Sequence, residues 1–298
     1  IILQRVSNKN IVRKLIVYDN QIILKVNPGF DLKSLKDRFK EAPKTIKVNN
    51  KDINYQNIEK ANYDDNTIKS TLRNNNINII YNLTFIWANP VVDCSYMLYN
   101  LNSVTYIDLT YFTFSSINNT EKMFADCQSL TSIKLPTTTL QLSIKDMNYM
   151  FYNCFSLKSL DLSRFKTPLV TNISGMFFNC RALTTLKITN MNTENVINAS
   201  YMFFSCSSLP SISLSNIKMT NALDISYMFY NCSNLAILDL SSFNCSNIIN
   251  IDSIFDNCNS ITSLDMSNFN FINISLSNKL FKSMKNLEFL KLSNINIT

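Results

Sequence analysis

The sequence predicts an α/β repeat fold, in which a solenoid of about eight coils follows a small α+β domain. Three observations predict this fold. A Met-Phe-x-x-Cys pattern returns every 26 residues along the C-terminal two-thirds of the chain, a leucine-rich stretch follows each copy, and residues 1–90 lack the pattern. A fixed period of roughly 20 to 50 residues is the signature of stacked repeats. We therefore expect an N-terminal cap domain over residues 1–90 and a solenoid over residues 91–298.

The repeat units share one register. The full pattern begins at Met123, Met150, Met176, Met202 and Met228. A variant begins at Ile254, and degenerate copies begin at Met97 and Leu280, where Leu101 and Met284 replace the cysteine. The spacing is 26 residues apart from one interval of 27. A single unit is too small to bury its own apolar face, so we expect stacking of the coils to supply the stability.

Each unit predicts one short strand and one short helix. In the stretch 157–162, Leu-Lys-Ser-Leu-Asp-Leu, the second half alternates apolar and polar residues, which predicts a strand with one buried face. Two columns of Asp and Asn flank the Met-Phe segment, and Asn172 and Asn179 represent them in one unit. Asp and Asn cap helix N-termini, and Asn tolerates the left-handed conformation that ends a helix. We therefore expect a helix of about two turns between Asn172 and Asn179, with Met176, Phe177 and Cys180 facing inward.

The recurring columns resemble a known family of repeats. The pattern Met-Phe-x-x-Cys-x-x-Leu-x-x-Leu-x-Leu-Ser-x-Phe-x-Thr, matched best by residues 150–175 and 228–253, resembles the BspA-like leucine-rich repeats of bacterial, mycoplasmal and protist surface proteins. The resemblance covers about residues 91–298. It implies a leucine-rich-repeat solenoid, a cell-surface or secreted location, a role in adhesion, and no catalytic residues. The last unit departs from the pattern, because Leu276 replaces the capping Asn and Met284 the cysteine.

The composition excludes most enzyme classes. The chain has no histidine, which rules out Ser-His-Asp triads, Cys-His pairs and histidine-ligated metals. Only Gly29 and Gly175 are glycine, so no glycine-rich loop can cradle a phosphate. Asp239 and Asp265 lie in neighbouring units, but an open strand face implies no cleft around such a carboxylate pair. We therefore expect no enzymatic activity, no cofactor and no metal.

The net charge and the length of the apolar stretches limit the kinds of partner that we expect. The net charge of +7 belongs to residues 1–90, which hold 15 basic and 8 acidic residues. The basic residues are interspersed with carboxylates, which favours a solvated surface over a nucleic-acid or membrane-surface site. No apolar stretch approaches the roughly 18 residues of a membrane helix. The sequence begins at Ile1 without a recognisable signal peptide, so we expect a mature or partial chain.

Eight cysteines are a signal for disulfides or a metal site, and eight glycosylation sequons are a signal for secretion. Six of the cysteines form one column of the repeat, so we expect parallel thiols that pack as small hydrophobes rather than disulfides. Asparagine, serine and threonine are abundant enough for chance to explain the sequons. If the compartment is secretory, Asn82 is the expected acceptor, whereas Asn172 and Asn198 are expected to act as caps.

The outward strand positions are the candidate partner-binding site. They are Ser159, Asp161, Thr185, Lys187, Ser211, Ser213, Ile237, Asp239, Ser263, Asp265, Phe289 and Lys291. This face is flat, rich in hydroxyls and mixed in charge, which favours a broad, multivalent contact over a small aromatic anchor. Expected partners are a protein or glycan on another surface, or other copies of the chain. A merely solvated strand face remains the alternative.

The N-terminal segment predicts a small mixed module. Expected strands span residues 11–18, 22–26, 45–48, 53–55 and 77–87, with a hairpin turn at Asp19-Asn20. Asp31 can cap a helix whose Leu32, Leu35 and Phe39 share a face. This order resembles a ubiquitin-like β-grasp module, and a β-rich cap over the first coil is the alternative.

Two hypotheses of function follow from these features. The first is a non-catalytic extracellular or cell-surface module for protein interaction or adhesion. The second is an intracellular structural scaffold, assembling through solenoid ends or sides in a filament, coat or cytoskeletal complex.

Overall fold

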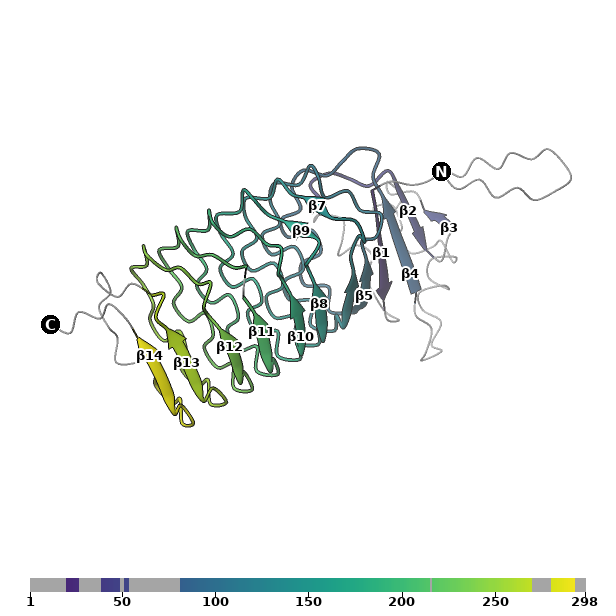
Figure 1. The fold of residues 1–298 in the computed structure, drawn as a ribbon. Helices are drawn as coiled ribbons and strands as arrows, with labels where there is room; N and C mark the ends of the chain where they lie inside the picture. The colour runs from purple at the N-terminus through teal and green to yellow at the C-terminus, as the bar shows by residue number, and fades with distance from the viewer. Residues whose placement is uncertain are drawn as a thin grey trace, which may run out of the picture.

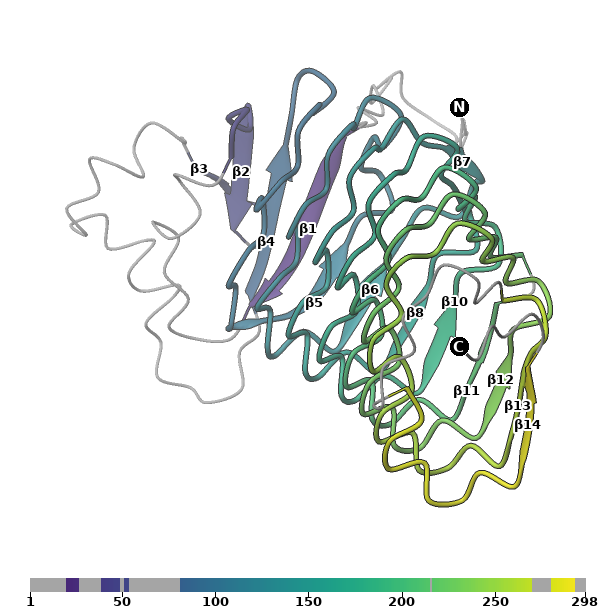
Figure 2. The same cartoon turned by 90° about the vertical axis from the view of Figure 1, so that its left-hand side faces the viewer.

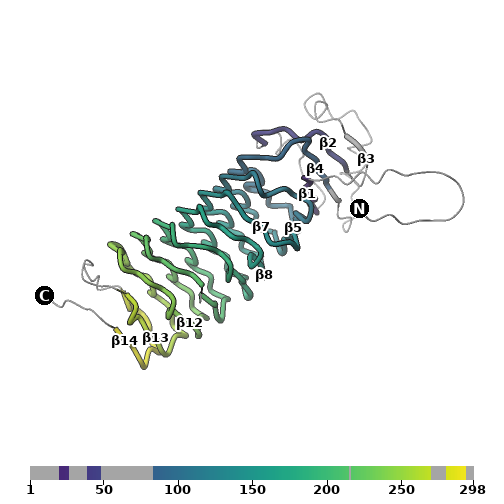
Figure 3. The backbone as a smooth tube through the Cα atoms, turned by 45° about the horizontal axis from the view of Figure 1, so that its top comes forward, coloured from purple at the N-terminus to yellow at the C-terminus, as the bar shows by residue number. Residues whose placement is uncertain are grey.

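In the computed structural model the chain forms an elongated solenoid, and the structure describes residues 20–26, 39–48, 51–53, 81–214, 216–269 and 280–292. One strand from each repeat lies along a common face (Figure 1). These strands are β5 (Val104–Asp108), β6 (Ser132–Lys134), β8 (Ser159–Asp161), β10 (Thr185–Lys187), β11 (Ser211–Ser213), β12 (Ile237–Asp239), β13 (Ser263–Met266) and β14 (Phe289–Leu292). Each of these strands begins a new coil within the described residues, and Figure 3 shows the coils stacked along one axis.

The predicted strands are confirmed, with parallel pairing between repeats. Leu186 of β10 stands opposite Leu160 of β8, and both leucines are buried while their strand neighbours are exposed. The same alternation holds in β11 and β12. Two short strands on another face, β7 (Leu140–Gln141) and β9 (Phe165–Lys166), also pair in parallel. The view turned by 90° in Figure 2 shows the strand row on one side and the turns opposite it.

The predicted helix in each coil is wrong, because the described repeats contain no helix. In the Met-Phe segment, alternate N–H groups donate to carbonyls of the following coil instead of to their own segment. In one coil these donors are Ile173, Gly175, Phe177 and Asn179, with N···O distances of 2.7–3.0 Å. The intervening N–H groups of Met176 and Phe178 close tight turns onto Ile173 and Gly175. The N–H groups that a helix would pair within its own segment therefore pair with carbonyls of the next coil instead.

The two Asp and Asn columns still serve the backbone, but in turns. Asn198 represents the first column, and its Oδ1 accepts a hydrogen bond from the Ser200 N–H at 2.9 Å. This is the two-residue Asx turn that competes with helix formation. Asn179 represents the second column, and its φ of 58° is left-handed, as its residue type predicted.

The core is a continuous stack of phenylalanine rings. They are Phe124, Phe151, Phe177, Phe203, Phe229, Phe255 and Phe281, with neighbouring centroids 5.2–6.5 Å apart. The rings are nearly parallel, since no interplanar angle exceeds 13°. All eight cysteines are buried and none forms a disulfide, which confirms the prediction that the cysteine column packs as small buried thiols.

The N-terminal strands extend the solenoid's strand row. They are β1 (Gln21–Val26), β2 (Thr45–Val48), β3 (Lys51–Ile53) and β4 (Tyr81–Ile86), and the sheet order is β3-β2-β4-β1-β5-β6. Strand β1 pairs antiparallel with both β4 and β5, so it follows the edge of the first coil. Trp87 packs against Phe39, Phe85 and Phe112 beneath this junction.

Other predictions for this segment rest on positions that the structure does not describe. Both the strand over 11–18 and the helix beginning at Asp31 lie outside the described residues, apart from Phe39. The boundary at residue 90 and the β-grasp resemblance stay predictions. Asn82 lies in β4, where its backbone pairs with Lys25, and its glycosylation also stays a prediction.

Candidate partner-binding surface

The strand face gathers all of the predicted partner-binding residues on one exposed surface. Parallel pairing sets them side by side, and every one of them is exposed. The neighbouring pairs are Ser159 with Thr185, Asp161 with Lys187, Ser211 with Ile237, Ser213 with Asp239, Ser263 with Phe289, and Asp265 with Lys291. The sequence therefore placed these side chains correctly, and their role in binding remains a proposal.

Charges on the strand face largely compensate one another. Lys187 lies 3.6 Å from Asp161, and Lys291 lies 2.9 Å from Asp265. All four side chains are more than half exposed, so these ion pairs contribute little to stability. The face is therefore close to neutral, and it offers no concentrated field to attract an oppositely charged partner.

The aspartates of this face lie at the last or next-to-last position of their strands. Asp239 accepts a hydrogen bond from the Ser241 N–H at 2.9 Å, and this bond lowers the pKa of the Asp239 carboxyl. Asp265 accepts from both the hydroxyl and the N–H of Ser267, and these bonds together with Lys291 lower its pKa to about 2. Such Asx turns recur wherever this column holds Asp. A local structural role thus accounts for the aspartates, and catalysis is not needed to explain them.

Two apolar side chains stand out on the strand face. Ile237 is 69% exposed and Phe289 is 56% exposed, and they occupy one column with Ser263 between them. Large apolar groups at the centre of a contact supply much of the binding energy in protein interfaces. These two residues are the strongest anchor candidates among those that the sequence singled out.

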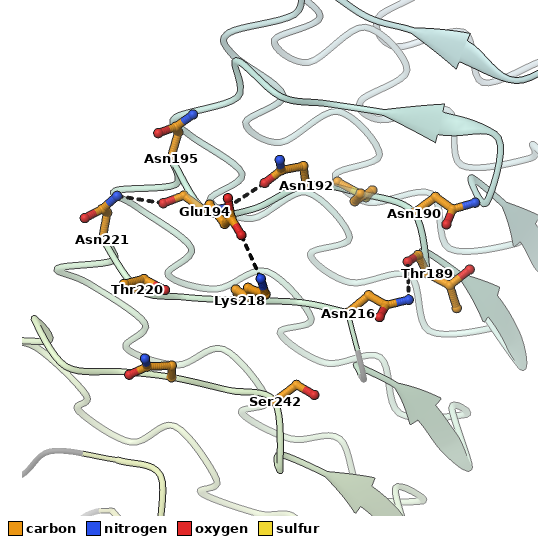
Figure 4. Close-up of a pocket in the computed structure, with 12 residues that line it drawn as sticks. Thr189, Asn190, Asn192, Glu194, Asn195, Asn216, Lys218, Thr220, Asn221 and Ser242 are labelled. Carbon is orange, nitrogen blue, oxygen red and sulfur yellow. Dashed lines mark hydrogen bonds and ion pairs between the residues drawn. The ribbon is translucent and has the colours of Figure 1, made fainter.

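A polar groove lies beside the strand row, and sequence analysis did not predict it. It has a volume of about 880 Å³ and is formed by loops of successive coils (Figure 4). Lys218 pairs with Glu194 at 2.8 Å, and the Asn216 and Asn221 amides donate to the carbonyls of Thr189 and Glu194. These side chains therefore tie neighbouring coils together. The signal in the sequence was the asparagine recurring every 26 residues.

An apolar stripe lies on another flank of the solenoid. Its members, Leu169, Ile197, Leu223 and Ile249, are between 40% and 62% exposed. Three of them directly precede the first Asp and Asn column, so the repeat register could have revealed the stripe. Leu169, Ile197 and Leu223 line a shallow hollow of about 700 Å³.

A third unpredicted surface carries aromatic side chains beside the Met-Phe segment. Tyrosine and phenylalanine recur at the position before the Met and at the position after the Phe, and their rings are partly exposed. The signal for this surface in the sequence is the tyrosine or phenylalanine that recurs on either side of the Met-Phe pair. The described residues contain no cluster of three acidic or thiol side chains that could hold a metal ion. They also include no helix long and apolar enough to cross a membrane.

Comparison with protein-family models decides the family. The model described as "Mycoplasma protein of unknown function, DUF285" matches residues 33–154, 92–212, 145–263 and 212–297. The chain belongs to the DUF285 family. These overlapping matches follow the repeats and together span most of the chain. Comparison with curated proteins gives no match for this DUF285 member.

Solved structures similar to this DUF285 chain include leucine-rich-repeat proteins. A leucine-rich-repeat protein of T. pallidum is 20% identical, with a TM-score of 0.41, covering 59% of this chain and 74% of that one. The TLR13–ssRNA13 complex is 17% identical, with a TM-score of 0.34, covering 71% of this chain and 40% of that one. A leucine-rich cell-surface protein from Faecalibacterium prausnitzii A2-165 is 15% identical, with a TM-score of 0.18, covering 64% and 83%.

Proposed function

We propose that this chain is a non-catalytic interaction module of the BspA-like leucine-rich-repeat type, which acts in adhesion at a cell surface or outside the cell. The observation that carries the proposal is the strand face, where equivalent positions of successive coils form one exposed, nearly neutral row. A row of this kind offers many similar contacts to a protein or glycan on another surface. Multivalency can then supply an affinity that no single contact provides.

The side chains of the strand face favour recognition over catalysis. Its carboxylates are committed to Asx turns and to lysine neighbours, and the chain has no histidine to act as a general base near neutral pH. The hydroxyl side chains that it carries are exposed to solvent. The residues present therefore suit recognition better than chemistry.

Adhesion is tested by measuring binding of the purified chain to candidate surfaces. Fluorescently labelled protein is titrated onto cultured host cells and onto immobilised extracellular-matrix proteins. The double variant Ile237→Ser/Phe289→Ser removes both apolar anchors, and we expect at least about a tenfold loss of affinity. Tyr111→Ser is the matched control, because Tyr111 is 54% exposed but lies outside the strand row. Equal binding by the double variant and the parent chain would overturn the role of this face.

Location is tested separately by intact mass spectrometry of the native protein, with and without glycosidase. A glycan on Asn82 would support an extracellular site in a eukaryotic source. Protease treatment of whole cells extends the test to sources that lack N-glycosylation: loss of the protein supports surface display, and complete protection contradicts it.

A second candidate function is a structural scaffold that assembles through the solenoid end. In the last coil Phe281 and Leu290 are only partly buried, whereas Phe255 and Leu264 at the same positions of the preceding coil are at most 1% exposed. Such an end can accept another copy. Sedimentation of the parent chain and of Phe281→Ser/Leu290→Ser tests this candidate. Dissociation of an oligomer by the double variant supports it, and a monomeric parent chain contradicts it.

A further inference from the structure

The face that follows the strand row carries two hollows that share a ridge of asparagine side chains. The polar groove of about 880 Å³ lies next to the strand ends, and the apolar hollow of about 700 Å³ lies farther along each coil. Asn195 and Asn221 line both of them. The two hollows are therefore neighbouring parts of one surface, which is polar on one side of the ridge and aliphatic on the other.

The ridge amides keep hydrogen-bonding capacity toward solvent. The Nδ2 of Asn195 donates to the Pro168 carbonyl and that of Asn221 to the Glu194 carbonyl, each at 2.8 Å (Figure 4 shows the second bond). An amide has two N–H donors and one carbonyl oxygen, so each of these bonds uses one donor and leaves the other. Both side chains are exposed, and their Oδ1 atoms accept no hydrogen bond from the part of the chain that the structure describes. Amides held in place by the neighbouring coil thus offer a donor and an acceptor at equivalent positions.

The groove carries no net charge. Lys218 and Glu194 are the charged side chains among the residues that line it, and they pair with each other at 2.8 Å. The other polar side chains that line it are neutral amides and hydroxyls. A nucleic acid would need lysine or arginine side chains to neutralise its phosphates. The surface therefore fits an uncharged polar ligand.

The repeat of the surface selects among uncharged chains. The N–H of Ile197 donates to the Thr171 carbonyl and that of Leu223 to the Ile197 carbonyl, at 2.8 and 2.9 Å, so the coils here have the spacing of parallel strands, about 4.8 Å. Equivalent side chains of an extended peptide return only after two residues, about 6.6 Å, and do not coincide with successive coils. One residue of an extended, β-linked pyranose chain advances by nearly the coil spacing. Consecutive sugars can therefore meet consecutive coils.

Both sides of the ridge match the chemistry of a sugar. A pyranose ring carries hydroxyl groups around its edge and C–H groups on its faces. Hydroxyl groups both donate and accept, as do the ridge amides. On the other side of the ridge, Leu169, Ile197 and Leu223 are between 40% and 48% exposed and offer an aliphatic surface to the C–H groups.

We propose that this surface is a binding site for a neutral, β-linked oligosaccharide that lies along the solenoid axis. The amides of Asn195, Asn216 and Asn221 hydrogen-bond the hydroxyls of the sugars. Ile197 and Leu223 contact the C–H faces and the methyl groups of N-acetylated sugars. The site uses none of the strand-face residues, so it does not depend on the function proposed for that face.

The test measures binding of tetrasaccharides to the purified chain by saturation-transfer NMR and isothermal titration. Chitotetraose and cellotetraose are the β-linked probes, and maltotetraose, whose α-linkages curve the chain, is the matched comparison. The residues that line the two hollows include no aromatic ring, so we expect weak binding of the β-linked probes, with a Kd of about 1 mM. Maltotetraose should bind at least about fivefold more weakly, because its sugars do not follow the coils.

Two pairs of variants locate the site. Asn216→Ala removes an amide of the groove, and its control is Asn268→Ala, because Asn268 makes the same bond to a carbonyl of the preceding coil outside the groove. Leu223→Ser removes an aliphatic contact, and its control is Val92→Ser, because Val92 holds the same repeat position in a distant coil and is 42% exposed.

Asn216→Ala and Leu223→Ser should each weaken binding of the β-linked probes about fivefold, the effect of losing about one hydrogen bond or one apolar contact. The two controls should bind as the parent chain does. Melting temperatures identify a variant that fails to fold, and the other pair then decides. Absence of binding by both β-linked probes, equal or tighter binding of maltotetraose, or equal losses in a variant and its control would each overturn the proposal.

Discussion

The thiol of Cys180 donates a hydrogen bond to the backbone carbonyl of Phe151, one coil earlier, across 3.2 Å. The same contact links Cys154, Cys206 and Cys232 to the phenylalanine of the preceding coil in each case. The repeated cysteine therefore both fills the core and pairs a buried carbonyl. The Phe151 carbonyl also accepts from the Cys154 N–H at 3.2 Å, so the thiol adds a second hydrogen bond to the same oxygen.

Stability should fall in alkaline solution because of this thiol column. Burial raises the pKa of Cys206 to about 12, from an ordinary value of 9.0, and Cys258 behaves alike. Above pH 9 the unfolded chain loses thiol protons that the folded chain keeps, so the free energy of unfolding decreases as the pH rises from 9 toward 12. The expected loss is about 1.4 kcal/mol per thiol and pH unit. Urea unfolding at pH 8, 9 and 10 measures it.

The control for the alkaline effect is Cys206→Ala/Cys258→Ala. This variant should be less stable at pH 7 and should lose less stability between pH 9 and 10, because two thiols no longer titrate. An unchanged pH slope would show that the cysteine column is not the cause.

Gly175→Ala should destabilise the fold by about 1–3 kcal/mol. The residue has a φ of 57°, where a side chain is strained, and its new Cβ atom would overlap the Tyr149 ring. Adding Tyr149→Ala should remove the overlap and leave the backbone strain, so the double variant should recover part of the loss. Thermal unfolding of the two variants measures the cost of the overlap and the cost of the backbone strain separately. A Gly175→Ala variant as stable as the parent chain would contradict this account.

Asn198→Ala should cost about 1 kcal/mol, because it removes two hydrogen bonds that close an Asx turn. The Asn198 Oδ1 accepts from the N–H and from the hydroxyl of Ser200, at 2.9 and 2.8 Å. Asn198→Asp keeps an acceptor at this place and should retain most of the stability. If both substitutions cost the same, the turn is not what this side chain supports.

Phe177→Ala should cost about 3–5 kcal/mol, since it opens a cavity within the stacked rings. Phe177 is fully buried between Phe151 and Phe203, whereas Phe281 at the end of the stack is only partly buried and has one described ring neighbour. We therefore expect Phe281→Ala to cost less than half as much. Denaturant unfolding of the two variants decides the point, and equal losses would contradict it.

The strands and the core were predictable because the repeat aligns equivalent residues. Leu160 and Leu186 fall in one column of the sequence and stand opposite each other in the structure. The exposed strand residues follow from the same register, since side chains alternate along a strand. Because the repeat recurs at a constant spacing, the pairing of residues far apart in the chain could be predicted from one sequence.

The helix prediction failed because the capping signals of Asn172 and Asn179 are ambiguous. An Asn side chain caps a helix and closes an Asx turn with similar local bonds, and a left-handed Asn ends either segment. What decides between them is the neighbouring coil, whose carbonyls take the N–H groups of Ile173 and Phe177. This competition depends on tertiary structure, so the local propensity of the sequence does not predict its outcome.

The hollow lined by Tyr96, Lys122 and Tyr149 was not predictable from the repeat, because Lys122 replaces the tyrosine of the neighbouring coils there. Lys122 reads in the sequence as ordinary variation. Its effect depends on the position of the Tyr149 ring over Gly175, which only the spatial arrangement reveals.

The ladder of backbone bonds between coils makes each 26-residue unit an interchangeable part. Ile173 donates to Asn198, Ala199 to Asp224, and Ile225 to Asn250, so these three junctions between coils share the same backbone contacts. Deleting or duplicating one whole 26-residue unit among these coils would rejoin the stack through the same type of backbone bond. Recombination between repeats can therefore change the reach of this molecule in steps of about 4.8 Å while its cross-section stays the same.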